Sequence, residues 1–306
     1  MITIVLILCI TALILLSLCR YCYWYAFKRD AGRQSDEYDV PKSGYREKIV
    51  ENIVKLMQTP FEDVYTTSHD GLKLYGRYYH FNDNAPLVII FHGYRSNAYR
   101  DGNGGFQIAK NYGLNVLIPD QRSHGKSEGT AITFGIKESY DCAQWIDYSK
   151  KRFGNDIRIV LVGLSMGAAT VMMASDKIPA ENVKGIIADC GFSSPKEILK
   201  EVAKQMKYPC EIAYFLTRMG AKLFGGFDVE ESSALEALAK TSIPLLFIHG
   251  ESDGFVPCYM SRKCYEACAS PKQIFTVKDA THGVSYYLDT PGYTKTVTDF
   301  FDRVLQ

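Results

Sequence analysis

The sequence lacks an excess of either charge. Its 35 Lys and Arg residues balance 34 Asp and Glu residues, which leaves a formal net charge of +1. Because nucleic-acid binding requires clustered basic charge, we expect no nucleic-acid partner. The chain also lacks the hydrophobicity of a multi-span membrane protein, since its mean hydropathy is −0.11. With 47% hydrophobic and 23% charged residues, the 306 residues predict a folded protein of one large domain or two ordinary ones.

A metal-binding cysteine pattern is also missing. Nine cysteines are present, and Cys264 and Cys268 lie four apart on an expected helix, but no partnering histidine or CxxC pair completes a zinc set with them. We therefore expect these thiols to act as small hydrophobic side chains, and we predict neither a metal nor a cofactor. Internal repeats and low-complexity tracts are absent from the sequence as well.

The lack of charge is most pronounced at the amino terminus, where no charged side chain precedes Arg20. Residues 2–19 are apolar, and a helix of this length measures about 27 Å, near the hydrocarbon thickness of a bilayer. Apolar residues on all sides favour a membrane span over a buried core helix. A cleaved signal peptide is the second alternative, but the basic first region and the small-residue cleavage site that it needs are missing. We predict a transmembrane anchor over residues 1–27.

Aromatic and basic residues follow the apolar run. The aromatic ones are typical of a membrane interface: Tyr21, Tyr23, Trp24 and Tyr25. The basic ones lie on the carboxyl side of the span: Arg20, Lys28, Arg29 and Arg33. The positive-inside rule then favours a cytoplasmic location for the rest of the chain, where thiols stay reduced. Because acidic residues dilute this charge, the orientation stays open; they are Asp30, Asp36 and Glu37.

Residues 28–60 are expected to form a linker and a leading helix at about 46–57, and residues 61–306 an α/β domain. Two strand-like runs first flank an Asp-Gly pair at 70–71, which is a hairpin signal. Apolar runs between helical segments then predict a parallel sheet covered on both faces. With the hairpin, eight strands are expected, the later ones at 87–93, 115–120, 158–163, 185–190, 244–250 and 273–277. Helices fit 104–112, 136–152, 166–175, 259–269 and 292–305.

One interval between expected strands is much longer than the others. It runs from Gly191 to Ser242, has helical character and is rich in aromatic residues. Long insertions at the carboxyl edge of a sheet often cover a binding site. We predict a helical lid at about 191–242, with an ordinary pair of packing helices as the alternative.

Residues 163–167 read Gly-Leu-Ser-Met-Gly between an expected strand and an expected helix. In this context the pattern predicts a tight turn that exposes a nucleophilic serine, and the two glycines remove side chains that would clash. The helix that begins beneath the serine favours negative charge there. Ser165 is therefore the predicted nucleophile.

A serine nucleophile needs a base, and the base needs an orienting acid. Of the six histidines, His282 lies in the loop after the last expected strand, and Asp253 follows the strand before it. The order Ser165, Asp253, His282 is the one expected for this architecture. Glu251 and Asp189 are rival acids. Surface positions are expected for His69 and His80, burial for His249, backbone bonding for His92, and no chemistry for His124.

The negative charge formed on a substrate oxygen needs two donors. We predict that they are the backbone N–H groups of Met166 and Tyr94. The side chain of Tyr94 either touches the substrate or packs as an ordinary aromatic residue.

The motifs FHGY, DQRSHGKSEG, GLSMG, HGESDGFVP and ATHG resemble, in this order, the α/β-hydrolase superfamily over residues 64–306. More narrowly, the chain is similar to membrane-anchored bacterial hydrolases of the lysophospholipase, monoacylglycerol lipase and serine aminopeptidase type. The resemblance implies an α/β-hydrolase fold, a lid between the sixth and seventh strands, and hydrolysis of carboxylic esters without a cofactor. Ser123 stands where the related loop usually carries Gly, which implies a changed loop conformation.

Three functions stay open at this point. The first is a serine hydrolase that cleaves carboxylic esters through an acyl-enzyme on Ser165, with a small-molecule or lipid ester as substrate. The second is a peptidase or amidase in which Glu230 and Glu231 hold a substrate ammonium. The third is a non-catalytic binding module tethered to a membrane. The sequence leaves the oligomeric state open.

Overall fold

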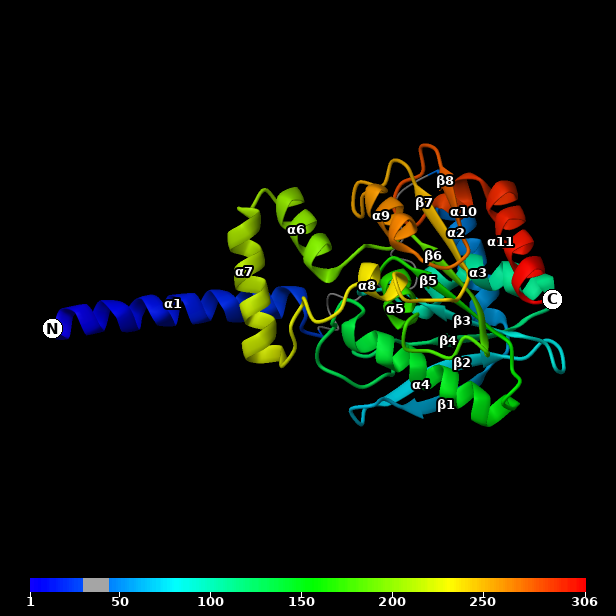
Figure 1. Cartoon of the computed structure of the whole chain (residues 1–306), viewed down its shortest axis with the longest axis horizontal. Coiled ribbons are helices and arrows are strands. Elements are labelled where there is room, and N and C mark those ends of the chain that lie inside the picture. The colour runs from blue at the N-terminus through cyan, green and yellow to red at the C-terminus, as the bar shows by residue number, and fades with distance from the viewer. Residues whose placement is uncertain (30–43) are drawn as a thin grey trace.

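The computed structural model describes residues 1–29 and 44–306, and Figure 1 shows one long helix projecting from a body of sheet and helices. The projecting helix is α1 (Ile2–Ala26), which is long and apolar enough to cross a membrane. Its amino-terminal side chains are exposed, whereas Cys19 and Tyr23 toward its carboxyl end are buried against the body. The linker positions expected at 30–43, including Arg33, lie outside the described residues.

The body is built on eight strands: β1 (Glu62–Thr67), β2 (Lys73–Tyr79), β3 (Leu87–Phe91), β4 (Asn115–Pro119), β5 (Ile159–Leu164), β6 (Val183–Asp189), β7 (Leu245–Gly250) and β8 (Lys272–Val277). Their order in the sheet is β1-β2-β4-β3-β5-β6-β7-β8. The pairs β1–β2 and β2–β4 are antiparallel, and the other neighbours are parallel. The predicted eight-stranded, mostly parallel sheet is confirmed.

Helices cover both faces of this sheet (Figure 1). They are α2 (Arg46–Gln58), α3 (Ala98–Tyr112), α4 (Ile136–Phe153), α5 (Met166–Ala174), α8 (Ala234–Leu238), α9 (Tyr259–Ala267), α10 (Ser285–Leu288) and α11 (Thr290–Val304). Because side chains alternate along a strand, Ile89 of β3 packs in a core with Trp145 of α4, while Ile90 packs in another core with Phe106 of α3. Both faces of the sheet are therefore covered by packed apolar side chains, as the continuous apolar runs predict.

Helix α3 begins earlier than expected. The sequence predicts a helix over 104–112, but the helix starts at Ala98 because the side chain of Asn97 accepts from the N–H groups of Tyr99 and Arg100 at 3.0 and 2.9 Å. Asn97 is therefore the N-cap of the helix, and because Asn is preferred at that position, the sequence contains a signal for this helix start. Three glycines within the helix weaken its intrinsic propensity and hide it. Packing explains one of them, since a Cβ on Gly104 would lie 3.0 Å from the ring of Tyr286.

The long interval between β6 and β7 holds α6 (Pro195–Gln205), α7 (Cys210–Gly220), the π-helical turn η2 (Ala221–Gly225) and α8. Figure 1 shows α6 and α7 standing away from the sheet, with α7 crossing the carboxyl half of α1. The contact is tight, because a Cβ on Gly220 would lie only 2.3 Å from the carbonyl oxygen of Cys19. The role of this insertion as a lid stays a prediction.

The carboxyl end of α1 packs into the body. Phe27 is fully buried, with its ring edge-to-face against Phe134 and Phe227 at centroid distances of 5.6 and 5.2 Å. The backbone carbonyl of Phe27 accepts from the N–H of Ile132 at 2.7 Å, and the next residue, Lys28, forms a β-bridge with Ala131. This end of the helix therefore belongs to the hydrophobic core and joins the projecting helix firmly to the sheet domain.

Candidate active site

Ser165 lies on the turn between β5 and α5, at a φ of 56° and a ψ of −115°. A positive φ is strained for a residue with a side chain, and it lifts the hydroxyl above the sheet. The flanking glycines make the turn possible. A Cβ on Gly163 would come within 2.2 Å of the carbonyl oxygen of Gly167, and a Cβ on Gly167 within 2.0 Å of the carbonyl oxygen of Phe91.

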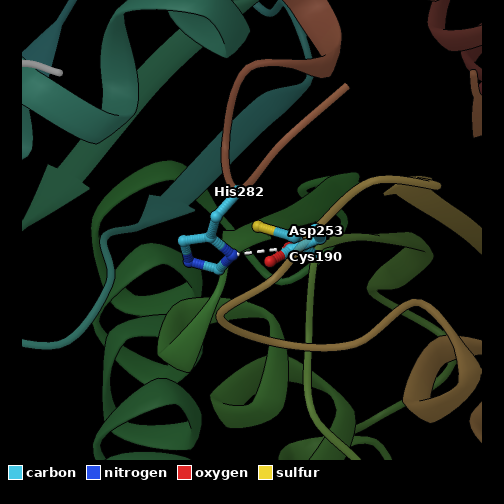
Figure 2. Close-up of side chains that lie close together, drawn as sticks. All are labelled: Cys190, Asp253 and His282. Carbon is cyan, nitrogen blue, oxygen red and sulfur yellow. Dashed lines mark hydrogen bonds and ion pairs between the residues drawn. The ribbon is translucent and has the colours of Figure 1, made fainter. Parts of the chain in front are cut away.

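Three side chains meet in a hydrogen-bonded chain above this turn. The Oγ of Ser165 lies 3.0 Å from Nε2 of His282, and Nδ1 of His282 lies 2.7 Å from Oδ2 of Asp253. Figure 2 shows His282 reaching from its loop to Asp253. Ser165 and Asp253 are buried, whereas His282 keeps partial contact with solvent. The three residues chosen from chain order are thus brought within hydrogen-bond distance of one another.

Asp253 is held by four groups. Its Oδ1 accepts from the backbone N–H groups of Phe255 and Val256, each at 2.9 Å. Its Oδ2 accepts from His282 and lies 3.2 Å from Nε2 of His249. Burial acts to raise the pKa of this carboxyl, but the hydrogen bonds from the two histidines outweigh it and hold the pKa well below its usual range. Asp253 is therefore an ionised acceptor that fixes the ring of His282.

His249 was expected to be buried and hydrogen-bonded, and it is. Its exposed fraction is 0%, its Nε2 lies 2.8 Å from the carbonyl oxygen of Val256, and its Nδ1 lies 2.6 Å from the hydroxyl of Ser261. Because a carbonyl only accepts, Nε2 carries the proton and points it toward Val256 and Asp253. The sequence does not reveal this support of Asp253, because His249 lies near the end of β7 and Asp253 in the loop after it, and no pattern signals their contact.

The rival acids have other partners. The Oε1 of Glu251 accepts from the hydroxyl of Thr276 at 2.8 Å on the protein surface. The Oδ2 of Asp189 accepts from the hydroxyl of Tyr293 at 2.9 Å, and burial raises the pKa of Asp189 to about 6. The backbone of Asp189 contributes in another way, because its carbonyl oxygen accepts from the N–H of Ser165 at 2.8 Å and steadies the turn.

The loop after β3 is fixed by its neighbours. The N–H of Gly93 donates to Asp101 at 2.7 Å, and the N–H of Arg95 donates to Nε2 of His124 at 3.0 Å. His124 is fully buried; burial first, and then the nearby His92, lower its pKa, so it is a neutral acceptor. His92 lies 2.9 Å from the carbonyl oxygen of Gly93, as its expected backbone role requires. The oxyanion roles of Tyr94 and Met166 stay predictions.

The side chain of Tyr94 reaches the end of α1. Its hydroxyl donates to the carbonyl oxygen of Ala26 at 2.7 Å, and its ring lies 5.0 Å from the ring of Phe134. The adjacent Arg95 donates from Nη2 to the carbonyl oxygen of Tyr25 at 2.6 Å. Of the two roles left open for this side chain, the structure favours packing, here reinforced by hydrogen bonds to the projecting helix. Tyr94 is therefore a positioning residue. Its side chain holds the loop after β3 in place, and that loop includes the backbone N–H of Tyr94.

Replacing Tyr94 by Phe is expected to lower kcat about 2- to 12-fold with KM little changed, because one hydrogen bond of about 0.5–1.5 kcal/mol no longer holds the loop. Steady-state kinetics on a soluble ester measures both constants. The matched control is Tyr112→Phe, which removes a hydroxyl bonded to Asp302 away from the site and should leave both constants unchanged. An unchanged kcat in Y94F would contradict the positioning role.

A cavity of about 300 Å³ opens beside Ser165 and His282. Aromatic and apolar side chains line much of it: Ile49, Leu164, Phe255, Val284, Tyr286 and Tyr287. Polar side chains from α3 and the loop before it contribute as well: Ser96, Arg100, Asp101 and Asn103. This volume lies at the small end of the range for small-molecule sites.

Cys190 lies beside Asp253 and His282, and the three could together hold a metal ion by distance alone (Figure 2). Their chemistry does not fit one. Burial raises the pKa of the Cys190 thiol well above its usual range, so the sulfur is a neutral thiol, whereas metal ligation requires the thiolate. The other two residues already bond each other at 2.7 Å. The group is better described as an acid–base pair with a packed thiol.

Comparisons with known proteins identify a matching family model and several similar chains. Residues 82–218 match the family model described as serine aminopeptidase, S33. The uncharacterized protein YqkD of Bacillus subtilis is 28% identical over 224 residues, 73% of each chain. The uncharacterized protein YfhR of Escherichia coli is 27% identical over 78% of this chain and 80% of its own. An uncharacterized membrane protein of Saccharomyces cerevisiae is 26% identical over 79% of each chain.

Solved structures share the fold. An esterase of Pyrococcus furiosus superposes with a TM-score of 0.66 at 25% identity, covering 82% of this chain and 95% of the esterase. Est1E of Butyrivibrio proteoclasticus, solved with bound ferulic acid, gives a TM-score of 0.61 at 22% identity, covering 79% of this chain and 99% of its own. The predicted arrangement of sheet and helices is thus shared with these two solved structures.

Proposed function

Because this chain belongs to the α/β-hydrolase superfamily, we propose that it is a serine hydrolase that cleaves carboxylic esters through an acyl-enzyme on Ser165. The observation that carries the proposal is the hydrogen-bonded chain from Ser165 through His282 to Asp253, with the serine on a strained strand-to-helix turn. This is the arrangement that turns a serine hydroxyl into a nucleophile.

In the proposed reaction, Oγ of Ser165 attacks the ester carbonyl while Nε2 of His282 takes its proton. Asp253 stabilises the resulting imidazolium. The carbonyl oxygen becomes negatively charged, and we assign its stabilisation to the backbone N–H groups of Met166 and Tyr94. His282 then gives the proton to the leaving alcohol. A water molecule attacks the acyl-enzyme by the same steps, which releases the acid and restores the serine.

Two features support an apolar ester as substrate. The cavity beside Ser165 is rich in aromatic and apolar side chains, and we propose that α1 anchors the protein in a membrane. The carboxylates that the peptidase alternative needs have other partners, and Oε2 of Glu231 accepts from the backbone N–H of Asp228 at 3.1 Å. Glu230 pairs with Lys196 and Arg218 at 2.8 and 2.6 Å, so it is committed to structural ion pairs. A cytoplasmic location of the catalytic domain stays a prediction.

Hydrolysis of p-nitrophenyl esters of increasing chain length tests the substrate class. The full chain, purified in detergent, is expected to turn over butyrate and longer esters with a higher kcat/KM than acetate, because each added methylene buried in an apolar pocket contributes about 0.8 kcal/mol. A panel of amino-acid arylamides is measured beside it. Release of amino acids without turnover of any ester would contradict the proposal and favour the peptidase alternative.

A further inference from the structure

The helix α7 and the turn η2 that continues it present four distinct faces. At 100° per residue, Ile212, Phe215, Leu216, Met219 and Leu223 fall on one stripe. A second face, with Tyr214 and Ala221, is buried. A third face carries ion-paired side chains: Glu211, Arg218 and Lys222. The fourth face, with Gly220, packs on α1. The apolar stripe is the face on which large apolar side chains are mostly exposed.

Three large apolar side chains of the stripe are exposed to solvent. Ile212, Phe215 and Leu223 are 61%, 53% and 55% exposed. A row of three large apolar side chains on one helix face is unusual for a surface in water and indicates contact with an apolar partner. An amphipathic helix with such a face and charged flanks is typical of helices that lie in a membrane interface.

The position of α7 on α1 identifies that partner. Gly220 packs on α1 at Cys19 and Tyr23, and Cys19 is the last residue of the apolar run before Arg20. If the apolar run fills the hydrocarbon layer, α7 crosses α1 at the boundary between lipid and water. The exposed rings of Tyr21, Trp24 and Tyr25 lie at the same level, as interfacial aromatic residues do.

The stripe also points in the required direction. Figure 1 shows α7 running across α1, with α6 between α7 and the body of the protein. The opposite face of α7 is turned toward α6, because Lys200 of α6 lies 5.1 Å from the ring centroid of Tyr214. The apolar stripe is therefore on the side that faces the amino end of α1, where the membrane would be.

We infer that the apolar face of α7 and η2 rests on the surface of the same bilayer that α1 enters. The inference rests on the proposed membrane anchor and deepens the proposed function, because it brings the active site to the lipid. At the end of α6, Gln205 donates to the carbonyl oxygen of Phe255 at 3.1 Å. Phe255 lines the cavity and its ring lies 5.1 Å from that of His282. An ester dissolved in the bilayer is then the substrate class nearest to the site.

Tryptophan quenching by brominated lipids tests the contact without any enzyme assay. Phe215→Trp is placed in a Trp24→Phe background, and the full chain is reconstituted in nanodiscs that hold one copy each. Because the buried Trp145 also emits, its fluorescence is measured in the same background without the Phe215→Trp change and subtracted. Lipids brominated on their acyl chains are expected to lower the remaining fluorescence at least twofold. The matched control is Phe61→Trp, an exposed phenylalanine next to β1, which should be unaffected. Equal quenching of F215W and F61W would overturn the inference, and so would an F215W signal that the brominated lipids leave unchanged.

Activity on two kinds of substrate tests the consequence. Phe215→Glu combined with Leu223→Glu is expected to lower turnover of a long-chain monoacylglycerol in vesicles about tenfold, while p-nitrophenyl butyrate in solution changes less than twofold. Phe61→Glu should leave both activities unchanged. An equal loss on both substrates would contradict delivery from the bilayer. If no ester is hydrolysed at all, the proposed function fails, whereas the quenching result still decides whether α7 contacts lipid.

Discussion

Replacing Ser165 by Ala is expected to lower kcat for ester hydrolysis about 10⁶-fold, because no other group can form the acyl-enzyme. Labelling of the protein by a fluorophosphonate probe should disappear at the same time. The change removes one oxygen atom from a turn whose φ of 56° both residues must adopt, so the fold is expected to persist. Covalent labelling followed on a gel and steady-state kinetics measure the two effects.

The matched control is Ser175→Ala. Ser175 is also buried, and its hydroxyl has no hydrogen-bond partner within the described residues. This variant should label and turn over like the unchanged protein. Labelling that persists in S165A would show that a different residue is the nucleophile and would overturn the assignment.

Replacing Asp253 by Asn is expected to lower kcat about 10⁴-fold, through the tautomer of His282. The Oδ1 of Asp253 accepts from two backbone N–H groups, so the oxygen of an amide must keep that position. The amide NH₂ group then takes the place of Oδ2 and donates to Nδ1 of His282. The proton of the imidazole is forced onto Nε2, which can no longer take the proton of Ser165.

The matched control for this prediction is Glu251→Gln, which makes the same change at the nearest rival acid. Because Glu251 bonds Thr276 rather than the histidine, E251Q should retain most of the activity. Steady-state kinetics of the two variants decides whether Asp253 or Glu251 is the acid that orients His282. A loss of activity in E251Q as large as that in D253N would assign this role to Glu251.

Replacing Asp253 by Asn is also expected to lower the free energy of unfolding at neutral pH. The folded pKa of Asp253 lies below its ordinary value, so the ionised carboxylate adds stability that is present above about pH 4 and lost as the pH falls further. D253N should therefore unfold at a lower urea concentration than the unchanged protein at pH 7. Kinetic comparisons are made at a temperature where both proteins are folded.

Much of the fold could be read from local patterns. The strands of the sheet core are continuous runs of Val, Ile and Leu, since both faces of the sheet are covered, and such runs predict β3 to β7 closely. The start of α3 could not be read as easily, because its glycines obscure a helix that Asn97 caps and packing stabilises. The division into anchor, linker and hydrolase domain stays a prediction.

The residues of the candidate site could also be predicted from the sequence. The carboxyl ends of parallel strands meet at one edge, so loops distant in the chain could be expected to converge there. This brought Ser165, Asp253 and His282 together as candidates, and their hydrogen bonds are consistent with that choice. The support that Asp253 receives from His249 depends on how a side chain of β7 and one of the following loop are directed, which no spacing rule predicts.

For the amino-terminal helix, some properties follow from the sequence alone, and others depend on the tertiary structure. Its length, its lack of charge before Arg20 and its apolar residues follow from composition alone, because membrane compatibility depends on hydrophobicity and not on neighbours. That Phe27 is part of the core, that Ala26 accepts the hydroxyl of Tyr94 and that Gly220 packs on Cys19 are contacts between residues far apart in the chain. Such contacts exist only once the chain has folded, and they turn an expected tether into a support for α7 and for the loop after β3.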